Sequence, residues 1–354
     1  MNYWLHSTWW KWLCVVLLLY VVFGSYMVPL SPGISKVEPL SFSPDSVYTF
    51  NISGYHTHFK DPATGKIQFW FKSGNDYFAA KNIQVISNDN ATVKFGVSSL
   101  QQDTLQSTNF DIVGNNDIDG TFALREGVIL MKASKTDSLS TVAATKSNVE
   151  VVHNKRQFFA FPYREILYES LRNVFFHVPM WFAMTILVLF SLCYSVAYLY
   201  KGDMRYDIYA HQAIVAAIVF GICGLTTGMI WAKHTWGHYW VNDPKLNGAA
   251  VGVMIYFAYL VLRGSIDDEI KRARIAASYN LFSVVIFALF IYVIPRLTDS
   301  LHPGNGGNPA FSSYDLDSTL RVFFYPACAG WILLGCWLYS ILIRLELIKQ
   351  KQEL

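Results

Sequence analysis

Long stretches without any Asp, Glu, Lys or Arg dominate the pattern of hydrophobic and polar positions along the chain. These stretches cover residues 12–35, 173–200, 208–232, 246–262, 275–295 and 322–343. A helix needs about 20 apolar residues to cross a bilayer, so each stretch is long enough, with 246–262 at the short limit. The pattern therefore predicts six transmembrane helices. No small-residue cleavage site follows the first stretch, so we expect a retained anchor rather than a signal peptide.

Composition supports a membrane protein. Hydrophobic residues make up 53% of the chain and charged residues 15%, whereas a soluble domain carries about 25% charged residues. This excludes a soluble enzyme, a disordered chain and a disulfide-rich secreted module. The net charge of +3 does not point to nucleic acid. All five cysteines lie in the apolar stretches and none forms a CxxC pair, which excludes a thiol–disulfide motif.

The distribution of basic residues in the short connecting segments predicts the topology. With the N-terminus in the cytoplasm, the inner segments hold ten Lys or Arg residues and the short outer loops hold four. This asymmetry favours cytoplasmic N- and C-termini. We therefore divide the chain into an N-terminal transmembrane helix (1–35), an extracytoplasmic domain (36–172) and a five-helix membrane region (173–354).

The extracytoplasmic domain is expected to be mostly β. Short runs of strand-forming residues alternate with Gly, Asn and Asp clusters, a pattern typical of a sandwich. The runs are Tyr48–Ile52, Lys66–Lys72, Thr92–Val97 and Val128–Met131. The segment from Ile34 to Pro39, followed by Ser53-Gly54-Tyr55, resembles immunoglobulin-like TIG domains.

Candidate chemistry concentrates in the outer loops of the membrane region. The Trp-rich loop at 231–245 contains Trp231, Trp236, Tyr239, Trp240 and Asp243. Such a loop is either an interfacial aromatic belt or a surface that receives a large, flat, amphipathic ligand. The predicted topology places His177 and His302 on the same side of the membrane as this loop. Neutral imidazole is a common iron ligand, and a pair of histidines can hold haem iron from both faces.

The string Trp236-Gly237-His238-Tyr239-Trp240-Val241-Asn242-Asp243 resembles the tryptophan-rich WWD signature of haem-handling proteins in cytochrome c biogenesis. His-Val-Pro at 177–179, the position of His302 and the six predicted helices are similar to the CcmC type, rather than to the larger relatives CcmF and CcsA. The signature's usual Trp before the Asp is here Asn242, which removes one aromatic face. Trp231 or Tyr239 could compensate for it.

The resemblance implies a haem carrier and assembly factor rather than an enzyme. His177 and His302 would be metal ligands of a transient, non-covalent haem b, and Trp236, Tyr239 and Trp240 would hold the macrocycle. Asp243 would order the loop by accepting hydrogen bonds from backbone N–H groups. Four basic residues are candidates for the haem propionates or for headgroup anchors: Arg172, Lys233, Lys245 and Arg296.

The implied partners are an extracytoplasmic haem chaperone as acceptor and the ABC transporter subunits of the maturation system, in a bacterial inner membrane. Two alternatives stay open: a CcsA-type cytochrome c synthase that attaches haem to apocytochrome, and a non-haem membrane scaffold with a surface-binding domain. The pairs Gly224/Gly228 and Gly248/Gly252 have GxxxG spacing. They indicate close helix packing, within the bundle or against a partner subunit.

Overall fold

The computed structural model describes residues 7–42, 47–74, 76–96, 109–130, 159–302 and 316–353. The chain divides into two compact units. One comprises Met1–Val28 with Glu169–Leu354, and the other is Pro29–Tyr168. The first is helical and the second consists mainly of strands.

Six helices of the helical unit are long and apolar enough to cross a membrane, within the described ranges. They confirm the six spans predicted from the charge-free stretches. The elements are α2 (Trp9–Met27), the 3-10 segment η3 (Tyr168–Phe175), α3 (His177–Lys201), α4 (Met204–Trp236), α5 (Pro244–Gly264), α6 (Glu269–Ala288), the π-helical segment η4 (Leu289–Val293), α7 (Ile294–Leu297) and α8 (Ser318–Glu353). η4 and α7 continue α6, so these three elements form one span.

Local sequence signals explain where these helices begin and end. The side chains of Asp203, Asp243 and Asp268 accept hydrogen bonds from backbone N–H groups in the first turns of α4, α5 and α6. Gly202 and Gly237 follow α3 and α4 with φ of 68° and 79°. Asp is a favoured N-cap, and glycine adopts the left-handed conformation after a helix at little cost. These residues therefore define where the helices begin and end.

The first helix ends inside its charge-free stretch. α2 stops at Met27, and strand β1 (Gly33–Glu38) begins within residues 12–35. Pro29 and Pro32 lie between them. Proline has no backbone N–H to donate and its ring clashes with the preceding turn, so these residues end the helix. The length of a charge-free stretch therefore shows that the segment is apolar, but it does not give the length of the helix.

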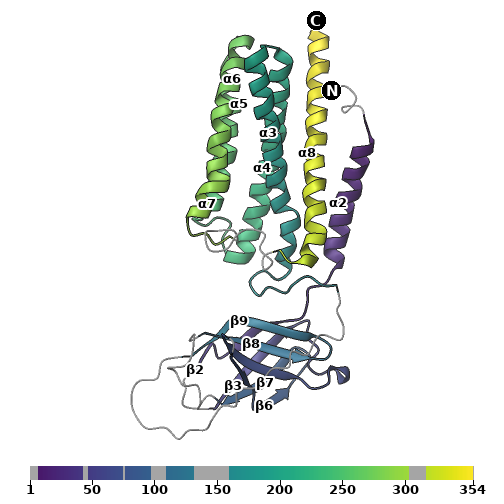
Figure 1. The fold of residues 1–354 in the computed structure, drawn as a ribbon, viewed down its shortest axis with the longest axis vertical. Helices are drawn as coiled ribbons and strands as arrows, with labels where there is room; N and C mark the ends of the chain where they lie inside the picture. Colours follow the sequence, from purple (N-terminus) through teal and green to yellow (C-terminus); the bar gives the residue numbers. More distant parts are fainter. Residues whose placement is uncertain are drawn as a thin grey trace. The chain divides into compact units, whose positions relative to one another are not determined.

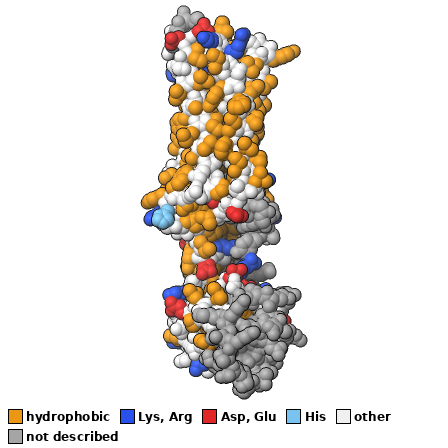
Figure 2. Space-filling model, turned by 90° about the vertical axis from the view of Figure 1, so that its left-hand side faces the viewer, with side chains coloured by type: hydrophobic (Ala, Val, Ile, Leu, Met, Phe, Trp, Pro, Cys, Tyr) orange, Lys and Arg blue, Asp and Glu red, His pale blue; other side chains and the backbone are white. Residues whose placement is uncertain are grey.

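Helix α3 lies at the centre of the helical unit, where it packs along α4 and against α6 and α8, while α2 packs on α8 (Figure 1). The interior contains fully buried residues such as Met184, Ala213 and Tyr256. Large apolar side chains also cover the outside, including Met254 at 66% and Phe282 at 68% exposure, and Figure 2 shows this apolar surface. Such a surface suits a lipid environment, which confirms the membrane assignment of this unit.

The second unit is a two-sheet β domain. One sheet has the order β1-β3-β7-β6 and the other β2-β9-β8-β4-β5. The remaining strands are β2 (Ser41–Phe42), β3 (Val47–Tyr55), β4 (Gln68–Ser73), β5 (Asp76–Ala79), β6 (Asn82–Val85), β7 (Asn90–Gly96), β8 (Asn109–Asn116) and β9 (Gly120–Leu130), with a short 3-10 turn η1 (Pro62–Thr64). Every pairing is antiparallel except β2 with β9.

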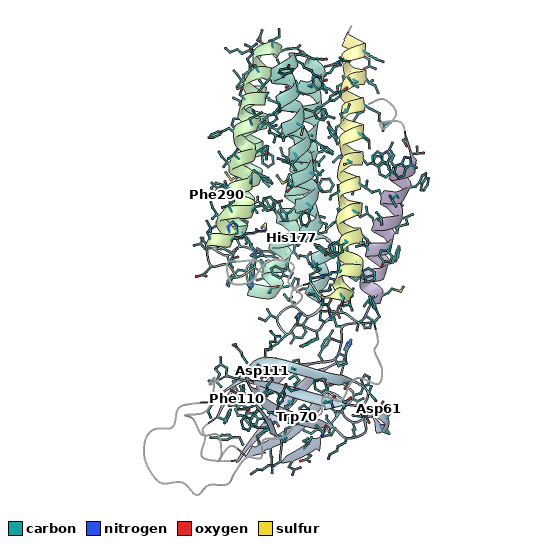
Figure 3. The ribbon with its side chains drawn as sticks, viewed as in Figure 1. Asp61, Trp70, Phe110, Asp111, His177 and Phe290 are labelled. Carbon is teal, nitrogen blue, oxygen red and sulfur yellow. The ribbon has the colours of Figure 1, made fainter. Side chains whose placement is uncertain are left out.

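The strand order is that of an immunoglobulin-like sandwich, in which strands A, B, E and D form one sheet and strands G, F and C lie in the other. Aromatic residues join the two sheets, with Phe71 of β4 stacked on Phe95 of β7 at 3.8 Å between ring centroids. Phe110 belongs to the same core (Figure 3). The predicted runs overlap β3, β4, β7 and β9. Lys66 and Ile67 precede β4, and Val97 and Met131 lie outside the described ranges.

Candidate functional site

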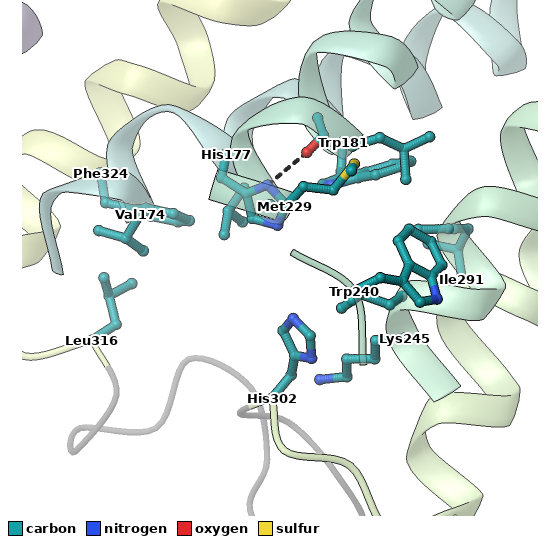
Figure 4. Close-up of a pocket in the computed structure, with 16 residues that line it drawn as sticks. Val174, His177, Trp181, Met229, Trp240, Lys245, Ile291, His302, Leu316 and Phe324 are labelled. Atoms are coloured by element: carbon teal, nitrogen blue, oxygen red, sulfur yellow. Dashed lines mark hydrogen bonds between the residues drawn. The ribbon is translucent and has the colours of Figure 1, made fainter. Parts of the chain in front are cut away.

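A cavity of about 320 Å³ lies at the end of the helical unit where α3 begins and α4 ends (Figure 4). Side chains from α3, α4, α5, η4 and α8 form most of its wall, and most of them are apolar. His302, from the loop after α7, also lines it. The volume is at the lower end of the range of ligand pockets. The predicted pair His177 and His302 therefore shares one cavity.

His177 is the first residue of α3, and its ring is held by α4. Its Nδ1 lies 2.9 Å from the carbonyl oxygen of Gly224 and 3.2 Å from Oγ1 of Thr227. A carbonyl oxygen accepts but cannot donate, so Nδ1 carries the ring proton. Nε2 then keeps its lone pair, which is the form of histidine that binds a metal.

His302 is held in the same way by a different acceptor. Its Nδ1 lies 3.0 Å from Oδ1 of Asp243. The His302 side chain is 14% exposed and that of Asp243 is 1% exposed. In the neutral ring, the carboxylate fixes the proton on Nδ1 and leaves the lone pair on Nε2, as for His177.

Asp243 joins the Trp-rich loop to the loop that carries His302. It caps α5 by accepting from the backbone N–H of Lys245 at 2.9 Å. Its other oxygen accepts from the hydroxyl of Ser300 at 2.9 Å and the backbone N–H of Leu301 at 2.8 Å. These bonds agree with the expectation that Asp243 orders the loop through backbone N–H groups.

The pKa of the Asp243 carboxyl reflects these contacts. Burial raises this pKa, but the hydrogen bonds from His302, Leu301 and Ser300 favour the charged form, and together they hold the pKa well below its usual range. The carboxylate is thus ionised at neutral pH. A fixed negative charge therefore faces the His302 ring.

Two tryptophans enclose His302. The centroid of the His302 ring lies 4.8 Å from that of Trp236 and 5.6 Å from that of Trp231. Trp240 lines the cavity itself. Tyr239 is 57% exposed and lies with its ring centroid 5.6 Å from Nζ of Lys233. The aromatic residues predicted from the sequence therefore have three different environments. Trp240 lines the cavity, Trp231 and Trp236 contact His302, and Tyr239 is exposed.

A model of the family described as "CcmC: Heme exporter protein C" matches residues 130–353, more than half of the chain. The chain belongs to the CcmC family. The match contains α3 to α8 and both cavity histidines, whereas α2 and most of the β domain lie outside it.

Individual relatives agree with this assignment. The chain is 26% identical to Heme exporter protein C of Escherichia coli (strain K12) over 187 residues, which are 52% of this chain and 74% of that protein. It is 22% identical to the protein of that name from Bradyrhizobium diazoefficiens over 183 residues, 51% of this chain and 68% of the relative. It is 30% identical to the cytochrome c biogenesis protein CcsA of Welwitschia mirabilis over 152 residues, 42% of this chain and 44% of that relative.

Asn242, at the position where the CcmC signature usually has Trp, is exposed. Its Oδ1 accepts a hydrogen bond of 2.8 Å from Nδ2 of Asn247. It is absent from the cavity wall, as far as the described residues define that wall. The departure from the CcmC pattern therefore affects the loop surface.

Trp181 lines the cavity and was not identified from the sequence. It follows His177 by four residues on α3, with 6.4 Å between the ring centroids. Residues four apart share a helix face, so this spacing was the available signal. Met229 and Phe324 also line the wall and were missed, because apolar residues inside a membrane helix carry no distinguishing pattern.

The four basic candidates have different surroundings. Lys245 lines the cavity. Nζ of Lys233 donates to the carbonyl oxygen of Gly237 at 2.8 Å. The buried Arg172 bonds to Glu169 at 2.6 Å and to the carbonyl oxygens of Ser25 and Val28 at the end of α2. Arg296 is exposed. In the described part of the chain, Lys245 is the one of the four that reaches the cavity.

The GxxxG pairs pack inside the bundle. A Cβ added to Gly224 would lie 2.9 Å from Trp181, and one added to Gly228 would lie 2.7 Å from His177. At Gly248 it would clash with the carbonyl oxygen of Phe290, in η4. Both pairs are therefore occupied by neighbouring helices of the same chain.

Proposed function

We propose that this protein binds haem b non-covalently in the cavity and delivers it to an acceptor haem chaperone during cytochrome c maturation. In this proposal, His177 and His302 would hold the haem iron. The observation that carries it is the matched state of the two rings: both line one apolar cavity, and each has Nδ1 hydrogen-bonded and Nε2 available. Membership of a family described as heme exporters supports it.

The chemistry of the cavity wall suits a large, flat, apolar ring system. Iron, when bound, supplies coordination positions on both faces of the macrocycle. The protein orients the two imidazoles, covers the ring with Trp181 and Trp240, and offers the Lys245 ammonium group to a propionate. Trp231 and Trp236 hold His302, while the exposed Tyr239 would cover the part of the macrocycle outside the cavity. Ligands that exchange readily suit a carrier that must release its cargo.

We further propose that the cavity faces the extracytoplasmic side of a bacterial inner membrane. The excess of Lys and Arg in the segments around residues 201–207 and 263–274, at the opposite ends of the helices, supports this orientation. Residues 36–172 then form an extracytoplasmic domain that docks the acceptor or the apocytochrome. ABC transporter subunits are the proposed membrane partners.

Absorption spectra of the detergent-purified protein test the haem site. We expect a six-coordinate b-type spectrum in the oxidised and reduced wild type that weakens in His177→Ala and in His302→Ala. The matched control is His234→Ala, a histidine in the last turn of α4 that does not appear in the described cavity wall. A wild type without haem, even after haem is supplied, would contradict the proposal and favour the scaffold alternative. Haem retained unchanged in both variants would assign its ligands elsewhere.

A cytochrome c synthase of the CcsA type is the second candidate, favoured by the 30% identity to a CcsA protein over 152 residues. A synthase attaches haem to apocytochrome by thioether bonds, whereas a carrier passes it on unmodified. Incubation of the haem-loaded protein with apocytochrome and reductant, followed by denaturing gels stained for covalent haem, separates the two. We expect no covalent product in the absence of further maturation proteins.

A further inference from the structure

Three glycines of α4 form a groove that accepts three side chains from successive turns of α3. Gly221, Gly224 and Gly228 follow one another at helical spacing, and a Cβ on each would meet Met184, Trp181 and His177 respectively. The last two of these α3 residues line the cavity and Met184 does not. The same groove therefore serves ordinary packing at one end and the cavity at the other.

At Gly228 the neighbour is the imidazole itself. A Cβ would lie 2.7 Å from Cε1, 3.3 Å from Nδ1 and 3.5 Å from Nε2 of His177. The first distance is shorter than van der Waals contact allows, so the ring would have to move away from α4. The hydrogen bond from Nδ1 to the Gly224 carbonyl, 2.9 Å long, holds the ring against the same helix. The ring cannot move without lengthening that bond or turning Nε2.

Several contacts with α4 restrain the His177 ring. Its ring contacts the bare backbone of Gly228 and, through Nδ1, the carbonyl oxygen of Gly224, which is one turn earlier in α4. Thr227 contacts the same Nδ1 at 3.2 Å and is itself fixed by donating to the carbonyl of Cys223 at 2.8 Å. α4 thus determines both the position of the ring and the nitrogen that carries its proton.

We propose that Gly228 is a positioning residue for the haem ligand His177: its missing side chain lets the imidazole rest on the backbone of α4 in the one orientation that directs Nε2 into the cavity. This inference rests on the proposed function, because it takes His177 to be an iron ligand. The Gly224/Gly228 pair would then do more than allow close helix packing, because the residue that packs against Gly228 is His177, the proposed iron ligand.

The test compares Gly228→Ala with Gly221→Ala in the full-length, detergent-purified protein. A Cβ at Gly221 meets the Met184 and Val253 side chains at 2.9 Å, away from the cavity wall, so this variant controls for altered packing in the same groove. We expect Gly228→Ala to lower haem affinity roughly 10–100-fold, as for other changes that disturb ligand orientation. The six-coordinate spectrum should weaken as well. Gly221→Ala should change neither.

A double-mutant cycle separates positioning from general damage. If Gly228 acts through His177, Gly228→Ala has no further effect on haem affinity once His177 is Ala. An equal loss in both backgrounds, or an equal loss from Gly221→Ala, would overturn the inference. So would an unchanged Gly228→Ala protein.

Nitrogen NMR of histidine-labelled protein without haem provides a readout that does not depend on the proposed function. The His177 signals are identified by their absence in His177→Ala. We expect Gly228→Ala to shift them and Gly221→Ala to leave them in place. Unshifted signals would refute the positioning role. A wild type that binds no haem, together with shifted signals, would refute the proposed function and keep the positioning role.

Discussion

At the scale of single residues, the two cavity histidines differ in what holds them. His177 donates to the backbone carbonyl of Gly224, whereas His302 donates to the buried carboxylate of Asp243. An anionic acceptor raises the basicity of the opposite ring nitrogen more than a carbonyl does. We therefore expect His302 to be the stronger electron donor of the pair and more sensitive to its acceptor.

Asp243→Asn tests this dependence. Asn is as good an N-cap as Asp, so α5 keeps its start, but the negative charge next to His302 is lost. We expect haem affinity to fall about tenfold or more, measured by titration of haem into the purified variant. The control is Asp268→Asn at the start of α6, whose carboxylate caps through the Lys271 N–H at 2.6 Å and should leave haem affinity unchanged. Equal effects of the two variants would argue against a specific role for the charge.

Trp181 yields a second residue-scale prediction. Replacing it with Leu removes the aromatic face next to His177 while keeping an apolar cavity wall. Since aromatic contacts add about 0.5–1.5 kcal/mol beyond burial, haem should bind several-fold more weakly with an unchanged ligand spectrum. Trp337→Leu, outside the cavity wall in the described residues, is the control. Loss of the six-coordinate spectrum would instead show that Trp181 orients the ligand.

At the scale of elements, the sequence predicted all six spans because a bilayer excludes charge over a whole helix. It predicted His177, His302 and Trp240 as neighbours of one site from topology and resemblance, and the structure brings these three to one cavity. The π-helical segment Leu289–Val293, which brings Ile291 to the cavity wall, has no sequence signal. Neither does the acceptor of His177, because a backbone carbonyl is present at every residue and its use depends on packing. Asp243 was identified from the sequence, but its hydrogen bond to His302 was not.

A buried ion pair joins two helices at the end away from the cavity. Arg263 in the last turn of α5 holds Asp207 in the first turn of α4 by two bonds of 2.6 and 2.8 Å. Removing one partner leaves an uncompensated charge, so Asp207→Asn should lower the free energy of unfolding by about 3–5 kcal/mol. Thermal unfolding in detergent measures this effect, and the haem spectrum should not change.

Two further variants check the origin of that effect. Arg205→Gln breaks an exposed pair with Asp203 and should have little effect on unfolding. The double variant Asp207→Leu with Arg263→Met removes both charges and should recover most of the lost stability. A double variant as unstable as Asp207→Asn would show that the two residues act through other contacts.

At the scale of the whole molecule, each unit has its own hydrophobic core. The β domain contains its aromatic cluster around Phe50, Phe71 and Phe95, and the helical unit contains a separate buried cluster around Met184 and Tyr256. Domains with separate cores fold independently. The family match also begins at residue 130 and leaves most of the β domain outside. Haem binding should therefore belong to the helical unit alone.

Deleting the β domain tests this division. Leu30 and Phe161 form a β-bridge at the point where the chain enters and leaves the domain. A short Gly/Ser linker in place of residues 33–159 can therefore join the two sides. We expect the shortened protein to keep the wild-type spectrum and haem dissociation constant. Adding His302→Ala should weaken the spectrum and haem binding, as in the full-length protein. If the β domain docks the acceptor, haem should pass more slowly from the shortened protein to an acceptor chaperone. The change in absorption measures the rate of this transfer. A shortened protein that is folded but binds no haem would show that the cavity depends on the β domain.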